Sequence, residues 1–364
     1  MKILIIQDYL RSGGTERQSI LLANAFAAAG HVCTLLTFRP GGPLAATVSP
    51  GVNHRALQPF DSRLDWFAPD LMRAAQLAQP DIVLCMGRMA NCRAGGLQHA
   101  LPHSVVIATM RTGKPLPRLF RRSLHLVRHI VANSRDARTN LIDQYEVNAA
   151  RISVIHNSLV FPPESALVRP ETLRAAHGAG PATVVLLCVA MFRPEKNQRE
   201  LVELAALLPA TADWQLWLAG DGPARAACEH LVAERQLGAR VKFLGFHRDP
   251  SPLYLAADVA VHASRSESLS NFLIEAQAHG LPAVVYDAQG ISECFVPGRT
   301  GWLVPAGDRA GFVARLQPLL TDPAFRQACV APARAYARSE FDAARQTQAY
   351  LDLFAQLLKS APTS

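Results

Sequence analysis

Short apolar segments alternate along the chain with longer segments in which apolar residues recur at helical spacing. In the first part of the chain, strands are predicted at residues 2–7, 31–37, 52–57, 81–86 and 105–110. Several of these, such as 2–7, have almost no polar face, which is typical of strands buried on both sides of a parallel sheet. The alternation of such strands with helices predicts a doubly wound α/β domain.

The same pattern restarts in the second part of the chain. Further strands are predicted at 184–190, 214–219, 241–245 and 258–263. Between the two parts, residues 160–181 are rich in proline and glycine, which favours a linker with one short helix. We therefore predict two domains, 1–165 and 166–343, each large enough to bury its own core.

One strand-to-helix turn in the second part carries the candidate chemistry. The apolar run Val259–Ala263 predicts a buried strand. A helix is expected after it, with Ser268 or Ser270 as its N-cap and Gly280 as its end. Such a turn places polar side chains beside the open amides of a helix N-terminus.

Two acids flank this turn, Glu267 in the loop and Glu275 eight positions later in the helix. The amides at about Leu269, Ser270 and Asn271 have no partner within the helix and suit a phosphate. The hydroxyls, diphosphate and ribose of a sugar nucleotide match this layout. The alternative is a helix with a solvated glutamate near each end, since two acids eight apart are common by chance.

The Glu267–Glu275 pair, followed by Ala-Gln-Ala-x-Gly-x-Pro, resembles the E-x7-E signature of glycosyltransferase family 4. The similarity covers most of the chain and is densest from about 184 to 308. It implies the GT-B fold, an α/β architecture in which two Rossmann-like domains face a central cleft. The first domain would take the acceptor and the second the nucleotide sugar, and a last helix at about 344–358 would pack back on the first.

A glycine pair, Gly13 and Gly14, follows the first strand, and a helix is predicted from Gln18 to Ala29. The pair does not match the dinucleotide fingerprint G-x-G-x-x-G. It is similar to the N-terminal Gly-Gly loop of family 4, which lies between the acceptor and the donor phosphates. An ordinary tight turn is the alternative.

Cations for the donor diphosphate are expected after the strand 184–190. In the family an Arg and a Lys five residues apart bind the diphosphate; Lys196 matches the Lys, but Met191 stands at the position of the Arg. We expect Arg193 to supply that charge from a shifted position. The alternatives for Arg193 are an ion pair with Glu195 or a solvated side chain.

Two further glycines are candidate donor contacts. Gly220 follows the strand 214–219, in a segment similar to the family's second domain. Gly290 lies in a loop that resembles the family's GG-x-x-E loop, although Gln289 replaces the first glycine. The amide of Gly290 would hold the sugar or a phosphate.

The charge of the chain is uneven. Residues 1–165 contain 18 Lys and Arg against 10 Asp and Glu, while the remainder contains 19 of each, so the first part carries the whole net charge of +8. The excess is greatest at 111–138 and would attract lipid headgroups, pyrophosphates or nucleic acid.

The basic segment supplies four candidate ligands for an acceptor or anion. Arg111 follows Met110, near which many relatives have a histidine, and we expect its guanidinium to replace that ligand. A helix is predicted at 117–127 with Arg118, Arg121 and Arg122 on one side. It resembles basic elements that rest on anionic membranes, and a solvated surface helix is the alternative.

The composition sets broad limits on the protein. The seven cysteines are scattered and never spaced as CxxC, which favours reduced, buried thiols and no structural metal. No apolar run reaches the ~20 residues of a membrane span, and no signal peptide is expected. We predict a cytoplasmic protein, with peripheral attachment to the inner face of the plasma membrane left open.

The resemblance implies a retaining hexosyltransferase of polysaccharide or lipopolysaccharide synthesis, acting on a glycan or lipid-linked acceptor. The segment ESLSNFLIEAQ is similar to relatives that use UDP-sugars, with GDP-mannose as the second choice. Lys196 and Arg193 would stabilise the diphosphate, Glu275 would bind the ribose, and Glu267 would orient the sugar. Because the chain has no D-x-D pair, we expect no metal and no cofactor besides the donor substrate.

Three other functions are weighed. A phosphorylase or a sugar-phosphate synthase would share the fold. A non-catalytic sugar-nucleotide-binding protein would fit the missing Arg and His. A nucleic-acid-binding protein would explain the charge, but aromatic residues make up 7% of the chain and do not interleave with the basic run, so we expect no nucleic-acid partner.

Overall fold

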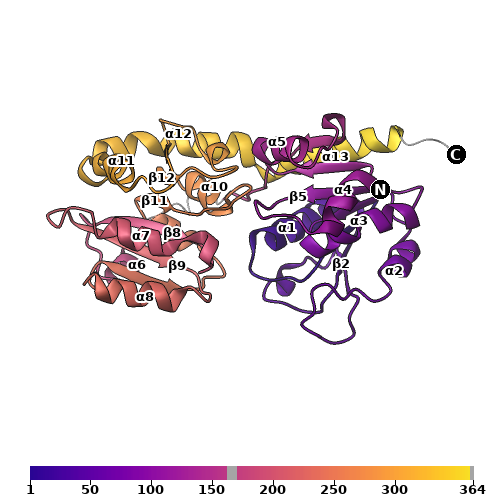
Figure 1. Cartoon of the computed structure of the whole chain (residues 1–364), viewed down its shortest axis with the longest axis horizontal. Helices are drawn as coiled ribbons and strands as arrows, with labels where there is room; N and C mark the ends of the chain where they lie inside the picture. The colour runs from indigo at the N-terminus through magenta and orange to yellow at the C-terminus, as the bar shows by residue number, and fades with distance from the viewer. Residues whose placement is uncertain (162–169, 361–364) are drawn as a thin grey trace. The chain divides into compact units, whose positions relative to one another are not determined.

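The computed structural model describes residues 1–161 and 170–360 and divides into two compact units. The first unit comprises Met1–Ser158 together with Ala343–Ser364, and the second comprises Leu159–Asp342 (Figure 1). The boundary predicted at residue 165 lies outside the described residues. Each unit is an α/β body with its own hydrophobic core, as the alternating pattern predicted.

The sheet of the first unit has seven parallel strands in the order β3-β2-β1-β4-β5-β6-β7. The strands are β1 (Lys2–Gln7), β2 (Val32–Thr37), β3 (Asn53–Ala56), β4 (Ile82–Cys85), β5 (Val105–Met110), β6 (His129–Ala132) and β7 (Ile152–Val154). The helices are α1 (Gly14–Ala28), α2 (Leu71–Ala78), α3 (Arg88–Ala100), α4 (Arg118–Leu126), α5 (Arg135–Asp143) and α13 (Ala343–Lys359), with 3-10 turns η1 (Ala45–Thr47) and η2 (Ala149–Arg151). Every residue of β4 and β5 is buried, which explains why all of them except Thr109 are apolar.

The prediction for the first helix was wrong at its N-terminus, because α1 begins at Gly14 and not at Gln18. Gly13 is the N-cap residue, and Glu16 lies in the first turn, where a negative charge is favourable. The glycine pair is therefore the start of the helix and not a separate turn before it. Helix α3 was not predicted.

The C-terminal helix α13 packs on the first unit. The Tyr350 and Phe354 rings lie 6.2 and 5.6 Å from the ring of Phe26 on α1, and all three side chains are buried. These contacts bury the apolar face of α13, and the other face is exposed. The end of the chain thus contributes to the core that the first strands build.

The sheet of the second unit has six parallel strands in the order β10-β9-β8-β11-β12-β13. The strands are β8 (Val184–Val189), β9 (Trp214–Ala219), β10 (Val241–Gly245), β11 (Val259–His262), β12 (Ala283–Tyr286) and β13 (Gly301–Val304). The helices are α6 (Glu171–Ala176), α7 (Gln198–Ala205), α8 (Arg225–Glu234), α9 (Ser251–Ala256), α10 (Asn271–Ala278), α11 (Arg309–Thr321) and α12 (Pro323–Phe341), with 3-10 turns η4 (Pro194–Lys196) and η5 (Ser292–Cys294).

Both sheets reverse their strand order once, between β1 and β4 in the first unit and between β8 and β11 in the second. In open parallel sheets, ligands bind outside the carboxyl ends of the strands at such a switch point. The two switch points are therefore the expected positions of ligand-binding sites.

Two composition-based expectations can be compared with the structure. All seven cysteines are buried and none is in a disulfide, in agreement with the scattered spacing. No helix in the described parts of the chain is both long and apolar enough to span a bilayer.

Candidate functional site

The loops that follow β8 and β11 meet at the switch point of the second unit. The backbone N–H of Arg265 donates to the Glu195 carbonyl at 2.8 Å, and the side-chain amide of Asn197 donates to the Ala263 carbonyl at 3.2 Å. These bonds hold the two loops together from strands that are neighbours in the sheet. The loop residues at 193–197 and 263–270 therefore form one site.

Lys196 and Glu267 form an ion pair at the centre of this site. Lys196 Nζ lies 2.5 Å from Glu267 Oε1, and the lysine side chain is 25% exposed while that of the glutamate is 9% exposed. Burial raises the pKa of the Glu267 carboxyl, but the Lys196 charge and bonds from Lys196 and a neighbouring histidine outweigh burial and lower the pKa to about 2. Glu267 is therefore a carboxylate at neutral pH.

The histidine is His262, the last residue of β11, and the sequence did not single it out. Its Nε2 lies 2.8 Å from Glu267 Oε1, and its side chain is 1% exposed. The other ring nitrogen, Nδ1, lies 3.9 Å from the Cys188 sulfur on β8. A carboxylate accepts and does not donate, so Nε2 carries the hydrogen in this arrangement. The available signal was a polar residue ending an apolar strand five positions before Glu267.

Glu275 lies on α10 and contacts Tyr254 of α9. The Tyr254 hydroxyl donates to Glu275 Oε2 at 2.5 Å, and the tyrosine ring stacks on His279 with centroids 4.9 Å apart. Glu275 is thus positioned by an aromatic side chain 21 residues away in sequence. No periodicity marks Tyr254 as a site residue, so only packing identifies it.

The turn from β11 to α10 has the predicted form. Ser270 is the N-cap residue of α10, without a side-chain cap bond, and Leu269 and Ser270 are both buried. Asn271 is the first helical residue, and Gly280 adopts a positive φ of 87° just after the helix. The amides at 269–271 therefore lie at a helix N-terminus, as a phosphate site requires.

Gly290 packs directly against this turn. A Cβ at Gly290 would lie 1.7 Å from the Ser268 carbonyl oxygen, and the residue has a φ of 73°. A side chain there would displace the backbone beside Glu267, so glycine is required at this position. The loop after β12 consequently borders the same site.

Gly220 and Arg193 border the loop after β8. A Cβ at Gly220 would lie 2.1 Å from the Ala190 carbonyl oxygen, and its φ is 133°. Arg193 is half-buried at the start of η4. Its guanidinium makes no hydrogen bond or ion pair within the described residues, so it pairs with neither Glu195 nor another acid there. This cation is available to an anion.

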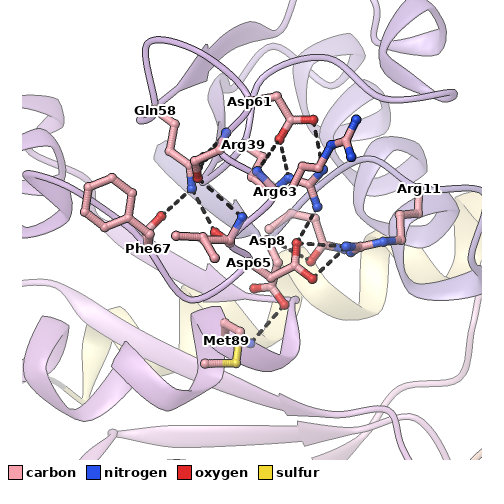
Figure 2. A network of polar contacts seen from close by, with 12 residues as sticks. Asp8, Arg11, Arg39, Gln58, Asp61, Arg63, Asp65, Phe67 and Met89 are labelled. Atoms are coloured by element: carbon pink, nitrogen blue, oxygen red, sulfur yellow. Dashed lines mark hydrogen bonds and ion pairs between the residues drawn. The ribbon is translucent and has the colours of Figure 1, made fainter.

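The switch point of the first unit contains Asp8, at the carboxyl end of β1. Its carboxylate accepts hydrogen bonds from the Met89 and Ala90 amides at 2.9 and 2.8 Å, in the first turn of α3 (Figure 2). Burial raises the pKa of Asp8 to about 6 in spite of these bonds. The sequence did not identify this acid. Gly13 and Gly14 follow it at the N-terminus of α1.

Arg111, the predicted substitute for a family histidine, contacts its own chain. Its guanidinium donates to Asn157 Oδ1 at 2.6 Å and to the Tyr350 hydroxyl of α13 at 2.7 Å. Its Nε is buried and has no partner in the described parts of the chain. One of its nitrogens therefore fastens α13 and another holds Asn157, and its role as a ligand stays a prediction.

The basic helix α4 exposes the three arginines that the sequence placed on one side. Arg118, Arg121 and Arg122 are exposed, whereas Phe120, Leu124 and Val127 are buried against the core. Leu119 is 55% exposed and lies among the arginines in sequence. The outer face of α4 is therefore cationic with an apolar residue on it.

A metal site is not evident in the described residues. No group of three or more His, Cys, Asp or Glu side chains that could hold a metal ion occurs within 1–161 and 170–360. That the reaction itself needs no metal ion stays a prediction.

Family models match both parts of the chain. Residues 12–159 match the family described as Glycosyltransferase Family 4, and residues 170–336 match the family described as Glycosyl transferases group 1. A similar curated protein is the lipopolysaccharide core biosynthesis glycosyltransferase LpsE of Rhizobium meliloti (strain 1021). It is 30% identical over 171 residues, which is 47% of this chain and 49% of LpsE. The chain thus spans about half the length of this relative.

Solved structures resemble the chain over nearly its whole length. Anabaena HepE in complex with UDP and glucose has a TM-score of 0.81 at 22% identity, covering 98% of this chain and 99% of that one. Sucrose-phosphate synthase from Thermosynechococcus elongatus has a TM-score of 0.81 at 21% identity, with 98% and 99% covered. At these identities the likeness shows the fold alone, which is the α/β GT-B architecture.

Proposed function

The chain belongs to family 4 of the glycosyltransferases, and from this premise we propose that it is a retaining hexosyltransferase using a nucleotide-diphosphate sugar. The observation that carries the proposal is the Lys196–Glu267–His262 cluster at the carboxyl ends of β8 and β11. A cation and a buried carboxylate meet there beside a helix N-terminus that suits a phosphate.

The donor proposed is a UDP-sugar, with GDP-mannose second. Supporting this choice are the likeness of 267–277 to relatives that use UDP-sugars and the UDP and glucose bound by the structural neighbour HepE. Lys196, Arg193 and the amides at 269–271 would neutralise the departing diphosphate. Glu275, oriented by Tyr254, would accept hydrogen bonds from the ribose.

The reaction proposed retains the configuration of the sugar. The bond between the anomeric carbon and the diphosphate oxygen breaks, and a bond to the acceptor oxygen forms on the same face. The proton of the acceptor hydroxyl passes to the departing phosphate oxygen. Glu267, held as a carboxylate, would orient the sugar hydroxyls and balance the positive charge that develops at the anomeric carbon.

The acceptor proposed is a glycan or a lipid-linked glycan of polysaccharide or lipopolysaccharide synthesis. The relative LpsE is a lipopolysaccharide core glycosyltransferase, which supports this class. We place the protein in the cytoplasm, with the exposed arginines of α4 facing an anionic membrane surface. Reversal of Arg118, Arg121 and Arg122 to Glu should weaken binding to anionic vesicles and spare donor hydrolysis.

The donor is tested first by thermal shift with UDP-, GDP-, ADP- and dTDP-sugars. A ligand at ~100 times its dissociation constant adds about 2.7 kcal/mol to the stability of the folded state. UDP-sugars should give the largest shift. A larger shift with another nucleotide would reassign the donor without affecting the family assignment.

Transfer is then measured with radiolabelled donor in EDTA, and the anomeric configuration of the product is determined. Full activity in EDTA and a retained configuration are expected. Loss of activity that Mn²⁺ restores would refute the metal-free mechanism, and an inverted product would refute retention.

A second candidate is a soluble sugar-phosphate synthase, since the sucrose-phosphate synthase likeness covers the whole fold. This enzyme would take a free sugar phosphate as acceptor. A screen of sugar phosphates, inorganic phosphate and glycan acceptors separates the two functions. Donor binding without turnover on any acceptor would favour a non-catalytic sugar-nucleotide-binding protein.

A further inference from the structure

The loop between β3 and α2 exposes an unusual set of large apolar side chains. We call residues 58–67 the aromatic loop. Its exposed members are Phe60 (71%), Leu64 (41%), Trp66 (54%) and Phe67 (41%). Single exposed apolar residues are ordinary, whereas a cluster within eight residues marks an interaction surface.

The loop is held in this conformation by polar groups on its inner side. Gln58 is 2% exposed, and its amide donates to the Leu64 and Phe67 carbonyls at 2.9 and 2.6 Å. The Ser62 hydroxyl donates to Gln58 Oε1 at 2.7 Å. Figure 2 shows Gln58 in contact with the backbone of the loop. The polar side chains thus face inward and leave the apolar ones in solvent.

Two arginines fasten the loop to the sheet. Arg39, which follows β2, pairs with Asp61 through Nε and Nη2 at 2.7 and 2.9 Å and with Asp65 through Nη1 at 2.7 Å. Arg11, which follows β1, donates to both oxygens of Asp65 at 2.8 and 2.6 Å. The Arg39 guanidinium also lies 3.9 Å from the centroid of the Tyr9 ring. Figure 2 shows these arginines converging on the two carboxylates.

These pairs neutralise the acids of the loop. The hydrogen bond from Arg39 lowers the pKa of Asp61 to about 2. Burial raises the pKa of Asp65, but the bonds from Arg11 and Arg39 outweigh it and lower that pKa. The loop therefore presents no unneutralised acid beside its aromatic residues.

Exposed arginines lie beside the aromatic residues. Arg63 is exposed within the loop, and Arg93 on α3 donates to the Trp66 carbonyl at 3.5 Å. Residues 82–135, which include α3 and α4, contain nine Lys and Arg and no Asp or Glu. Helices α3 and α4 pack side by side, since Gly95 of α3 lies against Ser123 of α4. The aromatic loop thus borders α3, which packs against the basic helix α4.

We propose that the aromatic loop inserts Trp66 and its neighbours into the interface of an anionic lipid bilayer, with Arg63 and Arg93 at the headgroups. Aromatic rings with one polar edge favour the boundary between headgroups and acyl chains. Arginines attract anionic headgroups, and their aliphatic stems cover apolar surface. A bilayer suits this combination, because the acids of the loop are paired with arginines and the exposed Arg63 and Arg93 complement a negatively charged surface. The inference deepens the membrane localisation proposed above, which relied on α4 alone.

Tryptophan fluorescence tests the insertion directly in the full chain. Trp214 and Trp217 are 2% and 0% exposed and Trp302 is partly buried, so Trp66 dominates the solvent-sensitive emission. Vesicles with one phosphatidylglycerol in three lipids should shift the emission to the blue, and brominated acyl chains should quench it. Trp66→Phe should abolish both effects while binding to vesicles persists. This readout needs neither donor nor acceptor, so its failure is distinct from failure of the enzymatic proposal.

Cosedimentation provides the second measurement. Phe60→Ser combined with Phe67→Ser should weaken vesicle binding by at least about tenfold, because inserted apolar area sets the strength of interfacial binding. The matched control is Phe246→Ser, an exposed phenylalanine (49%) of the second unit, which should bind normally. The melting temperatures of the Trp66→Phe, Phe60→Ser/Phe67→Ser and Phe246→Ser proteins should equal that of the wild type.

Two results would overturn the inference. Vesicle binding without a change in Trp66 emission would assign the attachment to the basic helix alone. The second result is a concentration-dependent dimer in sedimentation, formed without lipid, in which Trp66 is protected from a soluble quencher. If the Phe60→Ser, Phe67→Ser protein does not form this dimer, the loop binds a second copy of the chain and not a bilayer.

Discussion

His262 Nε2 lies 2.8 Å from Oε1 of Glu267, the same oxygen that Lys196 Nζ contacts at 2.5 Å. One carboxylate oxygen is therefore held from two sides, by a strand residue and by a loop residue. His262 is 1% exposed and cannot move far in its packed surroundings. We interpret it as a positioning residue for Glu267.

Replacement of His262 should lower kcat through Glu267. A hydrogen bond to a charged group contributes about 1.5–3 kcal/mol, so His262→Ala should reduce kcat by roughly 10- to 100-fold with little change in the donor KM. His262→Gln, whose amide reaches the position of Nε2, should recover part of the loss. Steady-state kinetics on both variants check this. Equal losses in Ala and Gln variants, with normal melting, would contradict a positioning role.

Lys196 and Glu267 should prove coupled in stability and in activity. Lys196→Met leaves a buried carboxylate without its cation, which should raise the pKa of Glu267 from about 2. The second unit should lose roughly 1–3 kcal/mol of stability. The loss is smaller than for a fully buried pair because Lys196 is partly exposed. Lys196→Met and Glu267→Gln should each reduce kcat by roughly 10²–10³-fold. The measurements are denaturant unfolding and initial rates.

The double variant, Lys196→Met with Glu267→Gln, separates the two effects. It should regain much of the stability that Lys196→Met loses, because no uncompensated charge stays buried, and it should stay inactive. Additive losses of stability in the double-mutant cycle would show that the two side chains do not interact.

Arg193 is expected to bind the donor diphosphate, and the position of Met191 allows a direct test. Arg193→Ala should weaken donor binding by about 1.5–3 kcal/mol, since a charge-assisted contact is lost. Met191→Arg in the Arg193→Ala background restores the family arrangement and should recover affinity. Calorimetric titration with UDP and with uridine distinguishes a phosphate contact from a base contact. An unchanged affinity for UDP in Arg193→Ala would remove Arg193 from the site.

Asp8 should make the stability of the first unit depend on pH. Its folded pKa, about 6, exceeds the ordinary value of 3.8, so between these values the folded state binds a proton that the unfolded state lacks. Stability is therefore greater below about pH 4 and falls as pH rises to about 6, by up to about 3 kcal/mol. The stability of wild type relative to Asp8→Asn, measured by calorimetric melting, should fall over this range. A difference that does not vary with pH would contradict the assignment.

Sequence reasoning recovered much of the fold because most of the strands are short and largely apolar. The predicted first strand, 2–7, and the strand 214–219 coincide with β1 and β9. Helix starts were less accurate: α1 begins at Gly14, although the sequence placed its start at Gln18. A glycine loop next to a strand can begin a helix directly or, as at Gly220 and Gly222, serve a close backbone approach to Ala190 and Phe192.

By itself the sequence determined the alternation of strands and helices, the repetition of that pattern in two halves, and the placement of Glu267 and Glu275 around one helix N-terminus, because these depend on local spacing. Only the tertiary structure showed which side chains meet these and other candidate residues. His262 and Lys196 meet at one oxygen of Glu267, Tyr254 reaches Glu275 from another helix, and Tyr350 reaches Arg111 across 239 residues. Such contacts depend on the order of strands in a sheet and on side-chain packing, neither of which leaves a periodic trace in the chain.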